Sequence, residues 1–398
     1  MANKLKFVKF KDILSIFLMI VAFLPAMIAK IFIRDFWLVC EDKNEARDNG
    51  YWFFKYVCEN HKQQKIAYAI GKKSPDYQKV KKLGKVISYG SLSHWFWYFV
   101  ADKNISSQKS GKPNAAVCYL LEVVLKLRKN NRVFLQHGVI INDLEFLYYK
   151  NTNMKRVCVS TKQEESFLKE HFGYPENSIQ LTGQSRFDDL LEGNTNSNQI
   201  LVMPTWRQWI SKEVEMKQIE GTNVFTESNY YKSWSQFLNN KKLHSILEKE
   251  NKTLVFYPHR NMQKYIEHFK TNSKNIVIAK FGNYDVHELL KESALLITDY
   301  SSVFFDFAYM KKPIIFYQFD EEKFREWQHK KGYFDYKTTT LAKWSKDENE
   351  VVDMILHYIK NNMQKENPDA VDEYFSNRDD KNCERIYNMI KEINKKQS

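Results

Sequence analysis

Four short apolar runs in this sequence each end in a cluster of polar residues suited to proton and phosphate chemistry. The clusters are Gln136, His137 and Gly138; residues 204–207, which end in Arg207; His259 with Arg260; and residues 298–302. A histidine titrates near neutral pH and can take a proton from an attacking hydroxyl. Arginines can hold a diphosphate and stabilise charge on a leaving phosphate. A single histidine after a strand is usually a capping or core residue, but two of them beside two arginines favour a site for phosphate chemistry.

The fourth cluster lies inside the run of residues 295–320, which reads as strand, loop, helix and strand. Thr298 and Asp299 end the first strand, and Ser301 and Ser302 precede a helix predicted over residues 303–310. A helix N-terminus presents unpaired N–H groups and the positive end of the helix dipole, and two hydroxyls there suit a phosphate. The simpler alternative is that Ser302 only caps the helix. Asp306, in the first helical turn, either contacts the ligand or compensates the helix dipole.

Short apolar strands alternate with helical stretches from residue 35 onward. The predicted strands are residues 36–40, 66–70, 85–88, 132–136, 157–160 and 179–182, then 200–203, 253–257, 275–279, 295–298 and 314–317. Continuous apolar runs of this kind are typical of buried parallel strands in βαβ units. A polar stretch, residues 192–199, separates the two series and is interpreted as a linker.

This pattern predicts an α/β protein of two doubly wound Rossmann-type domains facing a cleft, with ligands at the carboxyl ends of the strands. The expected division is a membrane-associating helical segment (1–34), an N-terminal Rossmann-like domain (35–195), a C-terminal Rossmann-like domain (196–345) and C-terminal helices (346–398).

The N-terminal segment contains 17 uncharged residues, 13–29, between basic flanks. A helix lying in an anionic membrane surface is favoured, because Pro25 and lysines on both sides suit an interfacial position. A single membrane span and a cleaved signal peptide are the alternatives, since about 17 residues is the lower limit for a span. Export would separate a nucleotide-type site from its substrate, which argues against the signal peptide.

The composition of the chain limits the classes of binding partner and the cellular setting that are expected. The 398 residues carry 61 Lys+Arg against 48 Asp+Glu, a formal charge of +13, which favours an anionic membrane surface or a polyanionic substrate. The sequence contains no zinc-ligand spacing and no RNP-like run, so no recognised motif points to nucleic-acid binding. The five scattered cysteines favour a reducing, intracellular setting.

Several blocks in this chain resemble, in order, those of the CDP-glycerol glycerophosphotransferase family, which includes teichoic acid polymerases and primases. They are WLVCEDKNEARDNGYWFFKY (37–56), FLQHGV (134–139), LTGQSRFDDLL (181–191), MPTWR (203–207), YPHR (257–260), ITDYSSVFFDFAYMKKPIIFYQFD (297–320) and GYFDY (332–336). The resemblance implies a GT-B-like fold, an amphipathic N-terminal membrane attachment and a CDP-alditol donor. It also implies that residues 35–195 form the acceptor-side domain and residues 196–345 the CDP-donor domain. Two departures concern the acceptor: Gln136 stands where the best-known polymerases carry Trp, and KTTTLAKW follows GYFDY without the family's Gly-Pro stretch.

The resemblance implies transfer of glycerol phosphate, or a related alditol phosphate, from CDP-glycerol or CDP-ribitol to a hydroxyl of a cell-surface polymer or its lipid-linked precursor, with release of CMP. His137 is the expected general base, and His259 and Arg260 are expected to neutralise the diphosphate. The remaining predicted substrate-binding residues are Gly138, Arg207, Thr298, Asp299, Ser301, Ser302 and Asp306. No cofactor is expected. No carboxylate cluster demands a metal, and metal dependence stays open.

Two other functions are compatible with these features. One is a GT-B glycosyltransferase that uses a nucleotide sugar for surface polysaccharide synthesis. The other is a non-catalytic membrane scaffold that binds an anionic polymer through the +13 charge. The Ser-Ser loop and the two histidine blocks favour phosphate transfer. The expected location is the cytoplasmic face of the cell membrane, peripheral or with one N-terminal span; the oligomeric state, like the choice of alditol, is left open.

Overall fold

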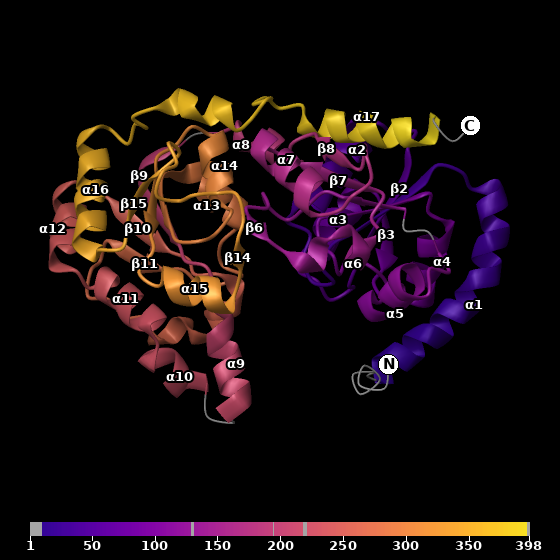
Figure 1. Cartoon of the computed structure of the whole chain (residues 1–398), viewed down its shortest axis with the longest axis horizontal. Helices are drawn as coiled ribbons and strands as arrows, with labels where there is room; N and C mark the ends of the chain where they lie inside the picture. Colours follow the sequence, from indigo (N-terminus) through magenta and orange to yellow (C-terminus); the bar gives the residue numbers. More distant parts are fainter. Residues whose placement is uncertain (1–9, 129–130, 194, 218–220, 396–398) are drawn as a thin grey trace. The chain divides into compact units, whose positions relative to one another are not determined.

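The computed structural model describes residues 10–128, 131–193, 195–217 and 221–395 (Figure 1). They form two compact units. Unit 1 contains the described residues up to 139, residues 145–188 and those from 379 onward, and unit 2 contains residues 140–144 and 189–378. Each unit is built on a sheet of parallel strands with helices around it, which confirms the predicted α/β class with two Rossmann-type halves.

The sheet of unit 1 has the strand order β3-β2-β1-β4-β5-β7-β8, and its pairings are parallel. The strands are β1 (Phe36–Cys40), β2 (Lys65–Ile70), β3 (Lys85–Ser88), β4 (Lys103–Ser106), β5 (Arg132–Phe134), β7 (Arg156–Val159) and β8 (Ile179–Leu181). The order reverses between β1 and β4. In doubly wound sheets, ligands bind outside the carboxyl ends of the strands at such a reversal.

Successive side chains along the strands of unit 1 point to opposite faces of the sheet, and both faces are apolar. Trp37 and Val39 of β1 point into one core, whereas Phe36, Leu38 and Cys40 point into the other. Helices α2 (Asn49–Asn60), α3 (Tyr77–Leu83) and α17 (Asn382–Lys395) contribute to the first core, and α1 (Phe10–Phe32), α4 (Leu92–Val100) and α5 (Ala115–Tyr119) to the second. The predicted C-terminal helical segment is therefore divided, because α17 packs on unit 1 whereas α16 (Glu348–Lys360) belongs to unit 2.

Helix α1 is part of unit 1. Ala22 and Ala26 are buried in its second core, and the Ser15 hydroxyl accepts a hydrogen bond from Trp95 Nε1 at 3.1 Å. The opposite face of α1 is exposed and apolar: Phe17, for example, is 62% exposed. By length and composition alone α1 could cross a membrane. The small alanines thus attach α1 to the domain while its large side chains remain available to an apolar surrounding.

The other elements of unit 1 connect these strands. They are the π-helical turn η2 (Leu120–Val124), η3 (Glu145–Leu147), α6 (Tyr149–Thr152), α7 (Lys162–His171) and α8 (Phe187–Leu190), the last of which leads into unit 2.

The sheet of unit 2 repeats the doubly wound order, β11-β10-β9-β12-β13-β15, with a reversal between β9 and β12. Its strands are β9 (Asn196–Met203), β10 (Thr253–Phe256), β11 (Ile276–Ile278), β12 (Ser293–Thr298), β13 (Ile314–Tyr317) and β15 (Lys343–Ser345). Its helices are α9 (Gln208–Lys217), α10 (Gly221–Glu227), α11 (Asn229–Leu238), α12 (Lys241–Lys249), η4 (Arg260–His268), α13 (Val286–Glu292), α14 (Phe304–Tyr309), α15 (Glu321–Trp327), α16 and η5 (Pro368–Glu373). A short antiparallel pair joins β14 (Lys330–Lys331) to β6 (Asn142–Asp143).

Two sequence interpretations need correction. The predicted linker, residues 192–199, is half strand, because β9 already begins at Asn196 and pairs there with Ser293; residue 194 lies outside the described residues. Its polar composition reflects exposure at the amino end of the strand, and not an irregular backbone. The strands β4 and β15 were missed because KNIS and KWS are short and carry no apolar run.

Candidate functional site

The clearest arrangement of reactive groups in unit 1 is a histidine–carboxylate pair at the carboxyl end of its sheet. His137 lies just beyond β5, and its Nδ1 is 2.5 Å from Oδ2 of Asp48, the N-cap residue of α2. The His137 side chain is 72% exposed, whereas that of Asp48 is 16% exposed. A carboxylate at Nδ1 favours the tautomer that carries its proton there, which leaves Nε2 as an acceptor. The pair has the chemistry of a general base with its orienting group.

Several neighbours fix this pair in place. Arg186 donates to Asp48 Oδ1 at 3.2 Å and to the backbone oxygen of His137 at 2.8 Å, and Gln108 Nε2 donates to Asp48 Oδ2 at 3.1 Å. Gln136, directly before the histidine, has φ of +65°, and its backbone oxygen accepts from Asn49 Nδ2 at 2.8 Å. This left-handed residue turns the chain out of the strand, so that His137 is presented to solvent and half-buried Gly138 follows it.

A second, buried carboxylate lies below the pair. Glu41 follows β1 and accepts hydrogen bonds from Gly50 N at 2.6 Å, from the Ser107 hydroxyl at 2.5 Å and from the Tyr68 hydroxyl at 2.5 Å. A Cβ atom on Gly50 would lie 2.7 Å from the Glu41 side chain, so this close approach requires glycine. Glu41 thereby joins β1, β2, the end of β4 and the start of α2.

The electrostatics of the three groups differ. The negative charge of Asp48 raises the pKa of His137 above its usual value. Burial by itself would raise the pKa of Asp48, but His137 and Arg186 hold that pKa below its usual value. Burial, together with the charge of Asp48, raises the pKa of Glu41 to about 7. Asp48 therefore carries the negative charge of this cluster near neutral pH, and Glu41 is partly protonated.

In unit 2, the structure places Arg207 in the interior. Its side chain is 0% exposed; Nε and Nη2 donate to Asp320 at 2.8 and 3.0 Å, and Nη2 lies 2.8 Å from Asp299 Oδ2. Tyr300 lies against the guanidinium, 5.1 Å away. Arg207 was predicted to contact phosphate or acceptor, but in this structure it holds together the loops after β9, β12 and β13.

Three other predicted ligand residues of unit 2 are also buried. Thr298 donates from Oγ1 to the backbone oxygen of Met203 at 2.7 Å, and Asp299 Oδ1 accepts from Thr205 N at 2.8 Å. Asp306 lies in the first turn of α14 and is buried as well. The contacts of Thr298 and Asp299 join the ends of β9 and β12, which positions the loops at the strand reversal.

Two predicted residues that follow β10 are accessible. His259 is half-buried, its Nδ1 accepts from Asn261 N at 3.1 Å, and its ring stacks on Trp206 at 6.2 Å between centroids. Since Nδ1 is an acceptor, a neutral His259 carries its proton on Nε2, where it can donate to a phosphate oxygen. Arg260 is exposed, with its guanidinium 5.2 Å from the ring of Phe281.

The two serines lie at the entrance to α14 and are half-buried. The Ser301 hydroxyl accepts from Val303 N at 3.4 Å, and the Ser302 backbone oxygen accepts from Phe305 N at 3.0 Å. The helix begins at Phe304 with Val303 as N-cap, and no side chain caps it. The simple capping role considered for Ser302 is therefore not what the structure shows.

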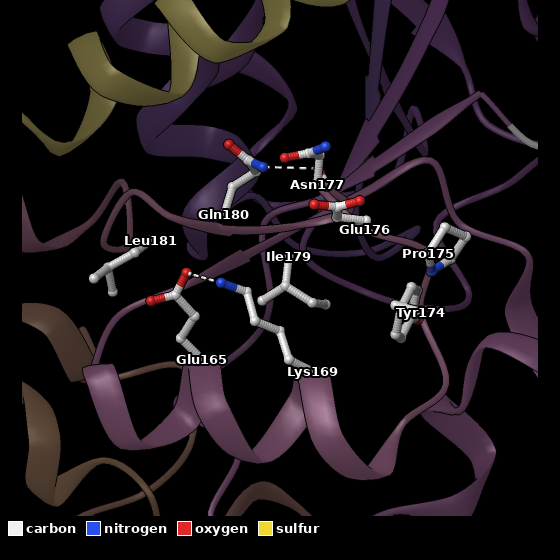
Figure 2. A pocket seen from close by; sticks show the side chains of 9 residues that line it. All are labelled: Glu165, Lys169, Tyr174, Pro175, Glu176, Asn177, Ile179, Gln180 and Leu181. Carbon is white, nitrogen blue, oxygen red and sulfur yellow. Dashed lines mark hydrogen bonds and ion pairs between the residues drawn. The ribbon is translucent and has the colours of Figure 1, made fainter.

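A polar cavity of about 530 Å³ beside α7 and β8 lies apart from these residues (Figure 2). Its lining includes Glu165 and Lys169, which form an ion pair at 2.7 Å across one turn of α7, and Gln180. None of the predicted site residues lines it. Within the described ranges, no group of three or more His, Cys, Asp or Glu side chains is arranged to hold a metal ion.

The sequence singled out His137 but did not reveal its full environment. Asp48 and Arg186 lay in recognised blocks but were not predicted as site residues, and Gln108 had no signal, because its position depends on the missed strand β4. Had β4 been predicted between β1 and β5, Gln108 could have been placed near His137, since the residues after β4 must lie near those after β5.

Comparisons with known proteins identify the family of this chain. Residues 34–392 match the family described as CDP-Glycerol:Poly(glycerophosphate) glycerophosphotransferase. The chain is 32% identical over 373 residues to the minor teichoic acid biosynthesis protein GgaB of Bacillus subtilis, covering 90% of this chain and 40% of that protein. It is 32% identical over 202 residues to a teichoic acid poly(glycerol phosphate) polymerase of Bacillus spizizenii, covering 49% of this chain and 46% of that protein. The chain thus spans less than half the length of these two relatives.

Among solved structures, the wall teichoic acid polymerase TagF is similar, with a TM-score of 0.66 at 15% identity over 100% of this chain and 99% of that one. At this identity the likeness concerns the fold, and it confirms the GT-B-like class.

Proposed function

Because the chain belongs to the CDP-glycerol:poly(glycerophosphate) glycerophosphotransferase family, we propose that it transfers glycerol phosphate, or a related alditol phosphate, from a CDP-linked donor to a hydroxyl of a cell-wall polymer or its lipid-linked precursor. The observation that supports this most directly is the exposed His137 with Asp48 at 2.5 Å from its Nδ1. A hydroxyl becomes a competent nucleophile when a positioned base takes its proton, and this pair supplies such a base.

In the proposed reaction, the acceptor oxygen attacks the β-phosphorus of the donor. A new oxygen–phosphorus bond forms, and the bond from that phosphorus to the bridging oxygen of the diphosphate breaks. CMP leaves with the electron pair, and the proton of the acceptor hydroxyl moves to Nε2 of His137. Asp48 stabilises the imidazolium that results. Gln136 and Gly138 shape the turn that presents the base.

Unit 2 supplies the proposed donor contacts. His259 can donate from Nε2, Arg260 supplies an accessible positive charge, and Ser301 and Ser302 supply hydroxyls and backbone N–H groups beside α14. Hydrogen bonds to phosphate and positive charge stabilise a phosphoryl group in transfer. Arg207 acts indirectly in this proposal, by holding Asp299 and the loop that carries the serines.

The glycosyltransferase alternative predicts transfer of a sugar and release of a nucleoside diphosphate, so the released nucleotide separates the two reactions. The purified full chain should release CMP from CDP-glycerol or CDP-ribitol when a glycerol-phosphate acceptor is added. His137→Ala is expected to lower the rate by roughly 10²–10⁴-fold, the usual contribution of a positioned base. His171→Ala is the matched control, because His171 is an exposed histidine of the same unit on α7. A folded His137→Ala protein that releases CMP at the normal rate would remove this histidine from the mechanism.

We also propose that α1 attaches the protein to an anionic membrane surface. Its exposed face is apolar, with Phe17 and Leu24 among the outward side chains, and Lys11, Lys30 and Arg34 lie along or next to it. Each such basic residue can add about 1 kcal/mol of attraction at an anionic leaflet. The cytoplasmic face fits best, because the CDP-linked donor is intracellular.

A further inference from the structure

Unit 1 contains a second, much larger cavity, of about 1570 Å³, at the opposite end of the strands from His137. One wall is α1, through Met19, Phe23 and Met27, and another is η2 with the turn that follows it, through Leu121 and Leu127. The floor includes Lys103, Asn131 and Arg156, which lie at or just before the amino-terminal ends of β4, β5 and β7. These surfaces enclose a groove, called here the α1 groove.

The α1 groove is separate from the candidate catalytic site. Asn131 lines the groove directly before β5, whereas His137 follows the other end of that strand. The strand with its flanking residues, from Asn131 to Leu135, spans roughly 13 Å at about 3.3 Å per residue, and Gln136 then turns the chain so that His137 lies beyond that end. A group held at the floor of the groove therefore lies too far from His137 to be the reacting group.

The upper part of the groove is apolar and open. Phe23 packs edge-on against Phe99 at 5.4 Å, and Ile20 and Leu127 are 63% and 74% exposed. Exposed apolar side chains of α1 and η2, including Phe17 and Leu120, continue this surface beyond the groove. Monomeric soluble proteins rarely expose contiguous apolar surface of this kind unless it binds something.

The lower part is positively charged. Six cationic side chains line the groove, Lys30, Lys103, Lys126, Arg128, Lys155 and Arg156, against the three carboxylates of Asp102, Glu122 and Glu176. Asp102 is paired with Lys30 at 3.8 Å and Glu122 with Arg128 at 3.2 Å. Three carboxylates cannot neutralise six cationic side chains, so the lining keeps a net positive charge. Burial lowers the pKa of Lys103 and Arg156, as expected for cations removed from water.

We propose that the α1 groove binds one anionic phospholipid of the bilayer, with its phosphate on the basic floor and an acyl chain along α1 and η2. The apolar wall leading to a basic floor matches the two ends of such a molecule. The volume exceeds the 300–1,000 Å³ that is usual for small-ligand pockets, and the excess of three positive charges selects an anion over a neutral lipid. This inference does not depend on the proposed transferase activity.

A phospholipid is preferred over a lipid-linked acceptor because of the position of the floor. An acceptor must bring its hydroxyl to the general base, but the floor lies at the opposite end of β5 from His137. A bilayer lipid has no such requirement. Bound there, it would fix unit 1 on the membrane surface through a specific contact, in addition to the burial of the α1 face.

The test is native mass spectrometry of the full chain in detergent, titrated with phosphatidylglycerol or phosphatidylcholine. We expect one phosphatidylglycerol per chain and much weaker retention of phosphatidylcholine. The double variant Lys126→Glu with Lys155→Glu should bind phosphatidylglycerol at least about tenfold more weakly, because two attractive charges become repulsive. Lys72→Glu, on an exposed turn after β2 outside the groove, is the matched control and should bind like the wild type.

A second variant protects the test against misfolding. Leu127→Glu changes an exposed side chain of the apolar wall and should also weaken binding, with an unchanged thermal midpoint. Equal retention of both lipids, or unchanged binding by both the double variant and Leu127→Glu, would overturn the proposal. Preferential binding of a polyprenyl phosphate over phosphatidylglycerol would overturn it in favour of the lipid carrier. CMP release from CDP-glycerol on a soluble acceptor, measured in parallel, reports the transferase activity separately.

Discussion

Replacing Asp48 with Asn should slow transfer and shift its pH dependence. Asp48 accepts a hydrogen bond from His137 Nδ1 at 2.5 Å and raises the pKa of that histidine. A hydrogen bond to a charged group contributes about 1.5–3 kcal/mol. Because the His137 side chain is 72% exposed and screened by water, the lower part of that range applies. At 1.36 kcal/mol per factor of ten, kcat/KM is expected to fall roughly 10- to 30-fold.

The sign of the pH effect follows from the role of the base. His137 accepts a proton only when neutral, so the wild-type rate falls as the pH drops through the raised pKa of His137. Without the Asp48 charge that pKa decreases, and the acid limb of kcat/KM should move to lower pH even though the maximum is lower. The assay is CMP release from CDP-glycerol between about pH 5 and about pH 9, where histidine titrates.

Two controls make this test specific. Asp42→Asn removes the same charge from the same loop, where Asp42 accepts from Asn44 N, and should leave the profile unchanged. In the double variant with His137→Ala, the loss of Asp48 should have little further effect, because the two residues act as one unit. An Asp48→Asn enzyme with a wild-type acid limb would refute the coupling between the carboxylate and the base.

Four further expectations concern other parts of the molecule. Arg207→Met should destabilise unit 2 by about 3–5 kcal/mol in urea unfolding, because it leaves buried carboxylates unpaired. Arg260→Met, at an exposed position, should keep the wild-type stability and raise KM for CDP-glycerol. Equal stabilities of the two variants would contradict this difference. Ser302→Ala should raise the same KM roughly tenfold through a lost phosphate contact, and an unchanged KM would place the phosphate elsewhere. Burial raises the pKa of Glu41 to about 7, so in this pH range the folded state holds a proton that the unfolded state has already released. The free energy of unfolding should therefore fall as the pH rises from about 5 to about 7. Glu41→Gln should flatten this dependence, measured as Tm against pH, and an equally steep curve would argue against a protonated Glu41. Phe17→Glu, on the exposed face of α1, should reduce sedimentation with anionic vesicles without lowering Tm, and full sedimentation would assign membrane attachment to another surface.

The sequence by itself determined the fold class and the general position of the candidate site. Continuous apolar runs such as FWLVC and IIFY can be satisfied only as strands covered on both faces, and their alternation with helices leads to parallel βαβ units. In such units the residues after the strands gather at one edge of each sheet. His137, His259 and the two serines could therefore be placed at strand ends without knowing a single contact. These are local properties, which depend on neighbours in the chain.

Only the tertiary structure decided which of those strand-end residues are available to a ligand. Arg207 and Arg260 look alike in the sequence, each following an apolar strand, yet Arg207 is enclosed by Asp320, 113 residues further along the chain, whereas Arg260 is exposed. In the same way, Asp48 lies 89 residues before His137 and becomes its partner because α2 starts beside the end of β5. A sequence shows that a residue can form an ion pair, but the choice of partner depends on which distant strands become neighbours in the sheet.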